Sequence, residues 1–207
     1  MYLFDQRILG IIMLVLFGVI GAVKGLATGW DSSSNKPKGT LLAIIANTYN
    51  EYFSFIIGIP AAAILLITGQ QKIIDPIQLA SDMSGLRIGL EIAGLILFVL
   101  GNLLANWAFI KLGHNFQAGA PLPRMGGRLV TDGPYRLVRH PIYLSALCML
   151  LGISCLMQSL VYFVICIVSL VLNILVIPGE EKGLRQVYGE QYVAYMQHTK
   201  KLIPFVY

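Results

Sequence analysis

The chain has 207 residues, of which 57% are hydrophobic and only 12% are charged, and its mean hydropathy is +0.74. A soluble domain carries about twice that charged fraction, so the composition excludes an ordinary water-soluble protein. The net charge of +5 is compatible with nucleic-acid binding, but the basic residues flank apolar segments and form no continuous patch. We therefore expect a protein of the membrane with no nucleic-acid partner.

Five apolar segments predict an all-α integral membrane protein with about five transmembrane helices. These segments cover residues 8–27, 41–68, 86–110, 142–157 and 160–177. Only Gln158 and Ser159 separate the last two segments, which predicts a helical hairpin that crosses the bilayer and returns. Pro178-Gly179 is expected to end the last span, and Glu180–Thr199 is expected to form one amphipathic cytosolic helix.

Several polar residues lie within or beside these segments. Asn47–Glu51 either lies at the membrane interface, which we favour, or lines a cavity. Asn102 and Asn106 share one helix face, where they either bond a neighbouring helix, which we favour, or face a ligand. Glu91 is expected to reach the headgroups. The cysteines lie in apolar runs without a C-x-x-C pair, so no metal site or disulfide is indicated.

Charge predicts the orientation of the spans. With five spans, 12 of the 15 Lys and Arg residues lie on one side of the membrane, whereas four spans would split this excess between the two sides. The positive-inside rule then places the loop 111–140 and the C-terminus in the cytosol and the N-terminus outside. The host membrane is either a bacterial inner membrane or the endoplasmic reticulum.

The sequence divides into three N-terminal spans over residues 1–110 and a second part over residues 111–207. In the second part, Gly133–Tyr143 precedes the hairpin and Glu180-Glu181 follows it. Because the hairpin goes out and comes back, both clusters are expected to meet at one membrane face. Carboxylates that face Arg and His suit a zwitterionic cofactor with an ammonium, a sulfonium and a carboxylate.

The stretch Leu129–Tyr135, with Arg139-His140-Pro141 and Tyr143 after it, resembles the isoprenylcysteine carboxyl methyltransferase and phospholipid methyltransferase superfamily of integral membrane methyltransferases. Glu180-Glu181 and the tail as far as Ile203-Pro204 resemble the same superfamily. The resemblance implies S-adenosylmethionine as cofactor and a lipid or another amphiphilic small molecule as methyl acceptor.

The resemblance also implies roles for single residues. The residues expected to contact the cofactor are Gly127, Arg128, Leu129, Val130, Tyr135, His140, Pro141, Ile142, Tyr143 and Glu180. Arg139 and Glu181 are the expected catalytic residues, with Arg139 shaping the site or pairing with the carboxylates.

Structural alternatives exist for these residues. His140 could cap the helix that begins at Pro141, and Glu180-Glu181 could complement the dipole of a tail helix. Arg136 is expected to be a cytosolic anchor. Tyr188, Tyr192 and Tyr195, grouped at helical spacing in the tail, are expected to pack or to lie at the interface rather than to contact a ligand.

One departure bears on the acceptor. Carboxyl methyltransferases of this superfamily have an Arg for the substrate carboxylate four residues before the cofactor-binding Glu, a position that Val176 occupies here. This favours an amine or other heteroatom acceptor, such as a phosphatidylethanolamine-type lipid, with isoprenylcysteine carboxyl methylation as the alternative. Two further alternatives are a sterol-reductase-like oxidoreductase that uses NADPH, whose motif resembles Arg-His-x-Asn-Tyr, and a non-catalytic membrane scaffold.

Overall fold

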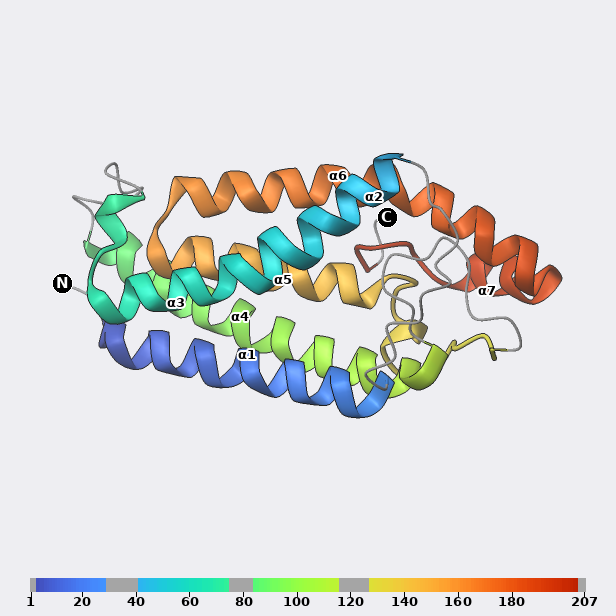
Figure 1. Cartoon of the computed structure of the whole chain (residues 1–207), viewed down its shortest axis with the longest axis horizontal. Helices are drawn as coiled ribbons and strands as arrows, with labels where there is room; N and C mark the ends of the chain where they lie inside the picture. The colour runs from blue at the N-terminus through green and yellow to red at the C-terminus, as the bar shows by residue number, and fades with distance from the viewer. Residues whose placement is uncertain (1–2, 29–40, 75–83, 116–126, 205–207) are drawn as a thin grey trace.

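The computed structural model describes residues 3–28, 41–74, 84–115 and 127–204. Over these ranges the chain forms an elongated bundle whose long helices run along one axis (Figure 1). These helices are α1 (Gln6–Thr28), α4 (Ser84–Leu112), α5 (Pro141–Met157) and α6 (Leu160–Tyr188). Beside them runs an unbroken series of α2 (Leu41–Thr48), the π-helix η1 (Tyr49–Gly58) and α3 (Ile59–Thr68). The predicted all-α fold is confirmed.

Shorter helices complete the described ranges. They are η2 (Gln71–Ile73), η3 (Gly113–Asn115), η4 (Gly133–Arg136) and α7 (Glu190–His198). In Figure 1, α7 lies at the end of the bundle opposite the N-terminus.

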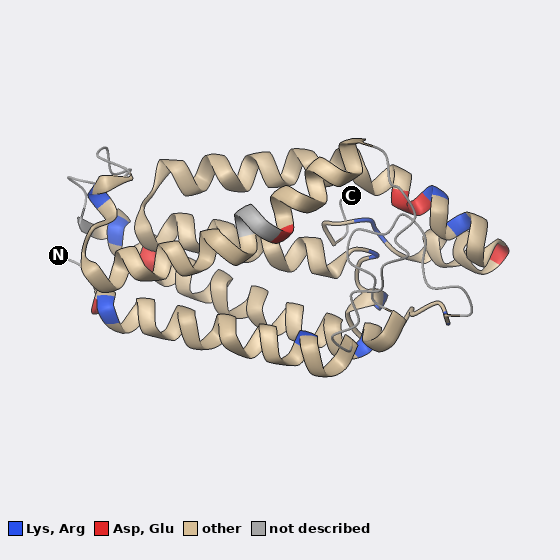
Figure 2. Ribbon diagram, viewed as in Figure 1, with Lys and Arg blue, Asp and Glu red and all other residues tan. Residues whose placement is uncertain are grey.

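Membrane-spanning capacity follows from length and composition. Four helical runs are long and apolar enough to cross a bilayer, and α5 is a shorter apolar helix of 17 residues, which rises about 25 Å. Large apolar side chains such as Val15, Leu103 and Val164 are exposed on the outside of the bundle. Figure 2 shows charged residues gathered toward the two ends. Because lipid covers such an apolar belt, the chain is a multi-pass membrane protein of about five spans.

Glycines allow α4 and α5 to approach closely. A Cβ atom on Gly152 would lie 2.7 Å from the backbone nitrogen of Phe98, and one on Gly101 would lie 2.8 Å from the carbonyl oxygen of Ser145. Small residues commonly bring membrane helices into backbone contact. This contact joins the expected N-terminal part of the chain to the part that begins at residue 111.

Pro178-Gly179, expected to end the last span, does not end the helix. The helix α6 continues through Pro178 and ends at Tyr188, before Gly189, which has a φ of +55°. Proline removes one backbone donor and crowds the carbonyl four residues earlier, but membrane helices tolerate it where neighbouring groups compensate. The predicted single tail helix is therefore the end of α6 followed by α7.

The C-terminal segment is held against the motif before α5. The backbone N–H groups of Arg139 and His140 donate to the carbonyl oxygens of Lys200 (2.8 Å) and Lys201 (2.9 Å), and Val138 forms an isolated parallel bridge with Lys200. These bonds hold the C-terminal segment beside the residues that directly precede α5.

Two polar predictions for α4 have different outcomes. Glu91 does not reach the headgroups, because its side chain is fully buried and accepts hydrogen bonds from the backbone nitrogens of Leu3 (2.8 Å) and Phe4 (3.3 Å). One carboxylate oxygen of Glu91 thus satisfies two N-terminal backbone donors inside the bundle. The amide of Asn102 approaches the sulfur of Met149 on α5 at 3.8 Å, as favoured, whereas Asn106 donates back to the carbonyl oxygen of Asn102 within α4 at 2.9 Å.

Candidate active site

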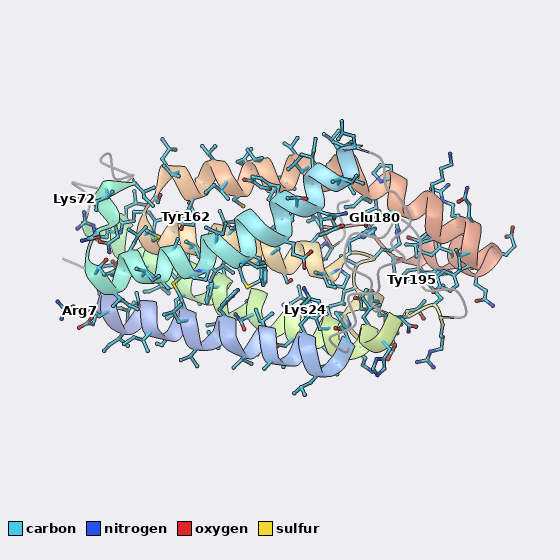
Figure 3. All side chains as sticks on the ribbon, viewed as in Figure 1. Arg7, Lys24, Lys72, Tyr162, Glu180 and Tyr195 are labelled. Atoms are coloured by element: carbon cyan, nitrogen blue, oxygen red, sulfur yellow. The ribbon has the colours of Figure 1, made fainter. Side chains whose placement is uncertain are left out.

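A cavity of about 400 Å³ lies near one end of the bundle, a size typical of small-molecule sites. Figure 3 shows Glu180, Tyr195 and Lys24, which line it, toward the end away from Arg7 and Lys72. Its walls come from every long helix, from η1 and α7, and from the segment 128–140. Both parts of the chain therefore contribute to the cavity.

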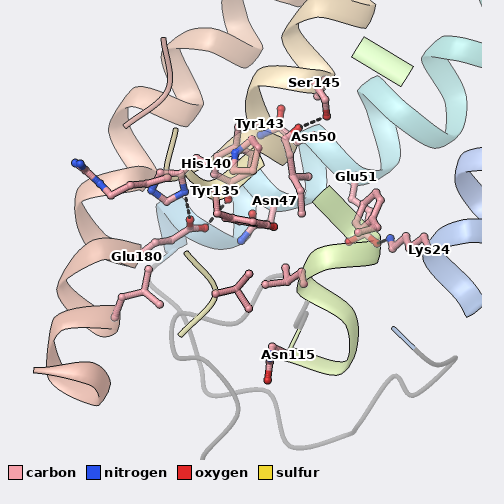
Figure 4. Close-up of a pocket in the computed structure, with 18 of the residues that line it drawn as sticks. Lys24, Asn47, Asn50, Glu51, Asn115, Tyr135, His140, Tyr143, Ser145 and Glu180 are labelled. Carbon is pink, nitrogen blue, oxygen red and sulfur yellow. Dashed lines mark hydrogen bonds and ion pairs between the residues drawn. The ribbon is translucent and has the colours of Figure 1, made fainter. Parts of the chain in front are cut away.

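Glu180 carries the carboxylate at one side of the cavity. The hydroxyl of Tyr143 donates to its Oε1 at 2.5 Å, and His140 Nδ1 lies 3.6 Å from its Oε2 (Figure 4). The rings of His140 and Tyr143 stack with centroids 5.7 Å apart. His140 is the N-cap residue of α5, but its side chain makes no capping hydrogen bond. The capping alternative is thus wrong, and the imidazole faces the carboxylates instead.

Arg139 and Glu181 form a buried ion pair at the cavity, and of the two Arg139 lines its wall. Arg139 Nε lies 2.7 Å from Glu181 Oε1, and the two side chains are 6% and 1% exposed. The guanidinium also donates to the carbonyl oxygens of Met196 (3.3 Å) and Thr199. Glu181 does not line the cavity, because successive helical residues point about 100° apart. Glu181 lies within α6, far from a helix N-terminus, so the dipole alternative is wrong.

Three tyrosines of the tail, expected to pack or to lie at the interface, also line the cavity, and two of them pack against each other. They are Tyr188, Tyr192 and Tyr195. The hydroxyl of Tyr195 donates to the carbonyl oxygen of Tyr135 at 2.5 Å. Among the described residues, the buried hydroxyls of Tyr135 and Tyr192 have no hydrogen-bond partner. Burial raises the pKa of both phenols, so they remain protonated donors at neutral pH.

Most residues expected to contact the cofactor do line the cavity. The set comprises Arg128, Leu129, Val130, Tyr135, His140, Pro141, Ile142, Tyr143 and Glu180. Gly127 is the exception, because it lies outside the cavity wall. Arg136 is exposed, in keeping with its expected role as an anchor.

An exposed ion pair holds the segment before η4. Lys111 Nζ lies 2.6 Å from Asp132 Oδ2, and this contact lowers the pKa of Asp132. Gly133 follows with a φ of +62°, and a Cβ atom there would lie 2.9 Å from the side chain of Lys111 and 3.1 Å from Trp107 Nε1. Glycine is therefore required in this turn.

The opposite wall of the cavity comes from the second apolar segment. Asn47, Asn50 and Glu51 line it, which bears out the cavity alternative; their position at the membrane interface stays a prediction. Glu51 Oε1 lies 3.2 Å from Lys24 Nζ on α1. Polar residues inside an apolar segment were the available signal, but the sequence does not show which helix they face.

The fold and this cavity define an integral membrane protein with a small-molecule site near one end of its bundle. A family model described as phospholipid methyltransferase matches residues 90–191. The protein-S-isoprenylcysteine O-methyltransferases B and A of Arabidopsis thaliana are 33% and 32% identical over 117 residues, which cover 55% of this chain and 58% of each relative. A probable protein-S-isoprenylcysteine O-methyltransferase of Oryza sativa subsp. indica is 30% identical over 60% of its length.

A solved structure of the eukaryotic intramembrane Ras methyltransferase, an isoprenylcysteine carboxyl methyltransferase, has the same fold. It aligns with a TM-score of 0.57 and 21% identity over 99% of this chain and 69% of that chain. The family model and the curated relatives support the resemblance of this chain to the isoprenylcysteine carboxyl methyltransferase and phospholipid methyltransferase superfamily, and the solved structure shows a shared membrane fold. The matched segment spans somewhat more than half the length of the curated relatives.

Proposed function

We propose that the chain is an S-adenosylmethionine-dependent methyltransferase that acts on a lipid-like acceptor. The observation that carries the proposal is the Glu180 carboxylate, which His140 and Tyr143 orient in a largely apolar and aromatic cavity. The family match and the relatives named as methyltransferases support it.

The residues of the cavity fit this cofactor. The Glu180 carboxylate suits the ammonium of its methionine part through a charge-assisted hydrogen bond. The buried hydroxyls of Tyr135 and Tyr192 are donors that lack a partner among the described residues, and buried donors usually have one. Ile142 and Val130 offer apolar contact to the adenine ring.

When bound, the cofactor supplies an electrophilic methyl group on a sulfonium. The chain has then to position the acceptor in line with that group and to exclude water. The ion pair of Arg139 and Glu181 fixes His140 and the C-terminal segment. Glu181 lies outside the cavity wall and is assigned as a positioning residue, whereas Arg139 lines the cavity.

For the acceptor we propose an amine or another heteroatom. Val176, at the position of the family's substrate-binding Arg, is apolar and lies outside the cavity wall, so a substrate carboxylate has no cation at that position. The cations that line the cavity elsewhere are Lys24, Arg128 and Arg139. A second candidate is isoprenylcysteine carboxyl methylation, which the names of the curated relatives favour.

Methyl-labelled cofactor distinguishes the two acceptors. Membranes that contain the protein are incubated with it, and the extracted lipid is then treated with mild base. An amine or heteroatom adduct keeps its label. Release of the label as volatile methanol identifies a methyl ester and contradicts the amine proposal.

Thermal shifts distinguish the methyltransferase from the NADPH-dependent oxidoreductase. We expect S-adenosylhomocysteine to raise the unfolding temperature and NADPH to leave it unchanged, because a ligand stabilises only the fold that binds it. Absence of binding by either compound would favour the non-catalytic scaffold.

A further inference from the structure

The cavity has a second charged side that the proposed cofactor site does not use. Lys24 on α1 and Glu51 on η1 form an ion pair of 3.2 Å there, and each side chain is about one third exposed, at 35% and 34%. Figure 4 shows this pair across the cavity from His140 and Glu180. Both residues precede the segment 90–191 that matches the family, so that match assigns them no role.

An ion pair on an apolar helix bundle adds little net stability compared with apolar residues at the same positions, so its presence indicates another role. Desolvation offsets much of the attraction within such a pair, and ionisable residues within membrane spans commonly mark a functional site. Lys24 and Glu51 join α1 to η1, a task that apolar contacts already perform, since Phe17 and Phe55 of the same elements pack with ring centroids 6.0 Å apart.

The backbone that carries Glu51 is firmly positioned. Asn50 donates to Asn173 at 2.8 Å and accepts from Ser169 at 2.6 Å, both on α6, and the hydroxyl of Tyr49 donates to the carbonyl oxygen of Ile165 at 3.1 Å. The segment is π-helical, a geometry frequent at functional sites. These contacts hold one charge of the pair at a fixed place on the wall.

The wall changes from charged to apolar along α1. Lys24 lies about one turn before the end of the helix at Thr28, whereas Phe17 lies seven residues, or about 10 Å, deeper in the bundle. Phe17, Phe55 and Ile56 line the cavity on this side. A charged end followed by an apolar stretch matches an amphiphile whose head lies near the membrane surface and whose tail lies inward.

We propose that Lys24 and Glu51 form the headgroup subsite for the acceptor, and that the headgroup is zwitterionic, with its anionic group at Lys24 and its ammonium at Glu51. The Glu51 carboxylate takes the ammonium proton, and the neutral amine then forms its bond to the methyl carbon as the bond from that carbon to sulfur breaks. This proposal rests on the proposed methyltransferase function. A zwitterion replaces the partner of each side chain, whereas a lone carboxylate would leave Glu51 facing a like charge and a lone ammonium would do the same to Lys24. The phosphate and amine of an ethanolamine phospholipid have the required charges.

The test compares Lys24→Gln, Glu51→Gln and the exchanged pair Lys24→Glu/Glu51→Lys with a matched control, Lys111→Gln. The control breaks an ion pair of 2.6 Å at the same end of the bundle but outside the cavity. Methyl transfer to phosphatidylethanolamine in mixed micelles gives KM and kcat, and calorimetry gives the affinity for S-adenosylhomocysteine. Native mass spectrometry compares bound phosphatidylethanolamine with phosphatidylglycerol and requires no cofactor.

We expect each single variant to raise KM for phosphatidylethanolamine by roughly 10- to 150-fold, the effect of losing a charge-assisted hydrogen bond. Its affinity for S-adenosylhomocysteine and its unfolding temperature should stay close to those of the parent chain. The exchanged pair keeps its mutual attraction but presents each charge at the other place, so it should remain folded with the raised KM. Lys111→Gln should leave KM unchanged.

Several outcomes overturn the subsite. The first is an unchanged KM in both single variants. The second is a purely structural pair: the single variants lose stability and have a raised KM, and the exchanged pair restores both stability and KM. The lipid-binding measurement can overturn the subsite without any cofactor. It does so if the parent chain and Lys24→Gln retain phosphatidylethanolamine and phosphatidylglycerol equally. A further outcome is methyl transfer to N-acylated S-farnesylcysteine alone, with a KM that changes in Lys24→Gln but not in Glu51→Gln. The headgroup in the subsite would then be a carboxylate and not a zwitterion. Failure of the parent chain to bind S-adenosylhomocysteine overturns the methyltransferase proposal instead.

Discussion

At the scale of single residues, Glu180 and Glu181 show how neighbours in sequence take different tasks. Glu180 faces the cavity and contacts Tyr143 and His140, whereas Glu181 points behind the wall and pairs with Arg139. The helical rotation between successive residues produces this division. Removing either carboxylate therefore has a different expected effect.

Glu180→Gln is expected to weaken binding of S-adenosylhomocysteine by roughly 10- to 150-fold, because a charge-assisted hydrogen bond contributes about 1.5–3 kcal/mol. Isothermal calorimetry in detergent measures this change, and the unfolding temperature checks that the fold is intact. Glu181→Ala should instead lower the unfolding temperature, since it leaves the buried guanidinium of Arg139 without its carboxylate. Equal small losses of affinity in both variants would contradict the ligand role of Glu180.

Tyr135→Phe and Tyr195→Phe form a second matched comparison. The hydroxyl of Tyr135 has no partner among the described residues, so its removal should leave the unfolding temperature of the ligand-free protein unchanged and weaken cofactor binding. The hydroxyl of Tyr195 donates to the backbone of residue 135, so its removal should cost about 0.5–1.5 kcal/mol of stability. Thermal unfolding with and without S-adenosylhomocysteine measures both effects. A ligand-induced shift that Tyr135→Phe leaves intact would remove this phenol from the binding site.

At the scale of helices, backbone contact between α4 and α5 supports the cavity. Gly152→Ala should destabilise the protein by about 1–3 kcal/mol, because the added methyl group would overlap backbone atoms of α4. Gly89→Ala, where nothing lies within 4 Å, should be neutral or stabilising. Thermal unfolding in detergent distinguishes them. Equal stability of the two variants would show that α4 and α5 are not in close contact in solution.

The sequence predicted the helices and the meeting of the two motif clusters better than the full cavity. Because only two residues connect α5 and α6, the two helices must run antiparallel. The residues before α5 and near the end of α6 therefore meet, and Arg139 and His140 do lie beside the two glutamates. The contact between Lys24 and Glu51 joins separate helices with no pattern that pairs them. The continuation of α6 through Pro178 depends on its packing within the bundle, which local propensity does not describe.

At the scale of the whole molecule, we propose the orientation that the basic residues predict, with the cavity on the cytosolic side. Single cysteines at Ser33, Thr131 and Thr199, in a background without native cysteines, should react with an impermeant reagent only from the cytosol. A cysteine at Gln70, exposed at the far end of α3, should react only from outside. Labelling of Thr131 and Thr199 from opposite faces would contradict the hairpin and the orientation together.

The pairing of Lys200 and Lys201 with the backbone of Arg139 and His140 also sets an order of events during biosynthesis. The motif before α5 emerges from the ribosome about 60 residues ahead of the strand-like segment that completes it, the separation of Arg139 from Thr199. A nascent chain stopped before Thr199 would contain every residue that lines the cavity but would lack the carbonyl groups that hold Arg139 and His140 in place. Insertion into the membrane and completion of the binding site are thus separate steps, and the second waits for the last-made part of the described chain.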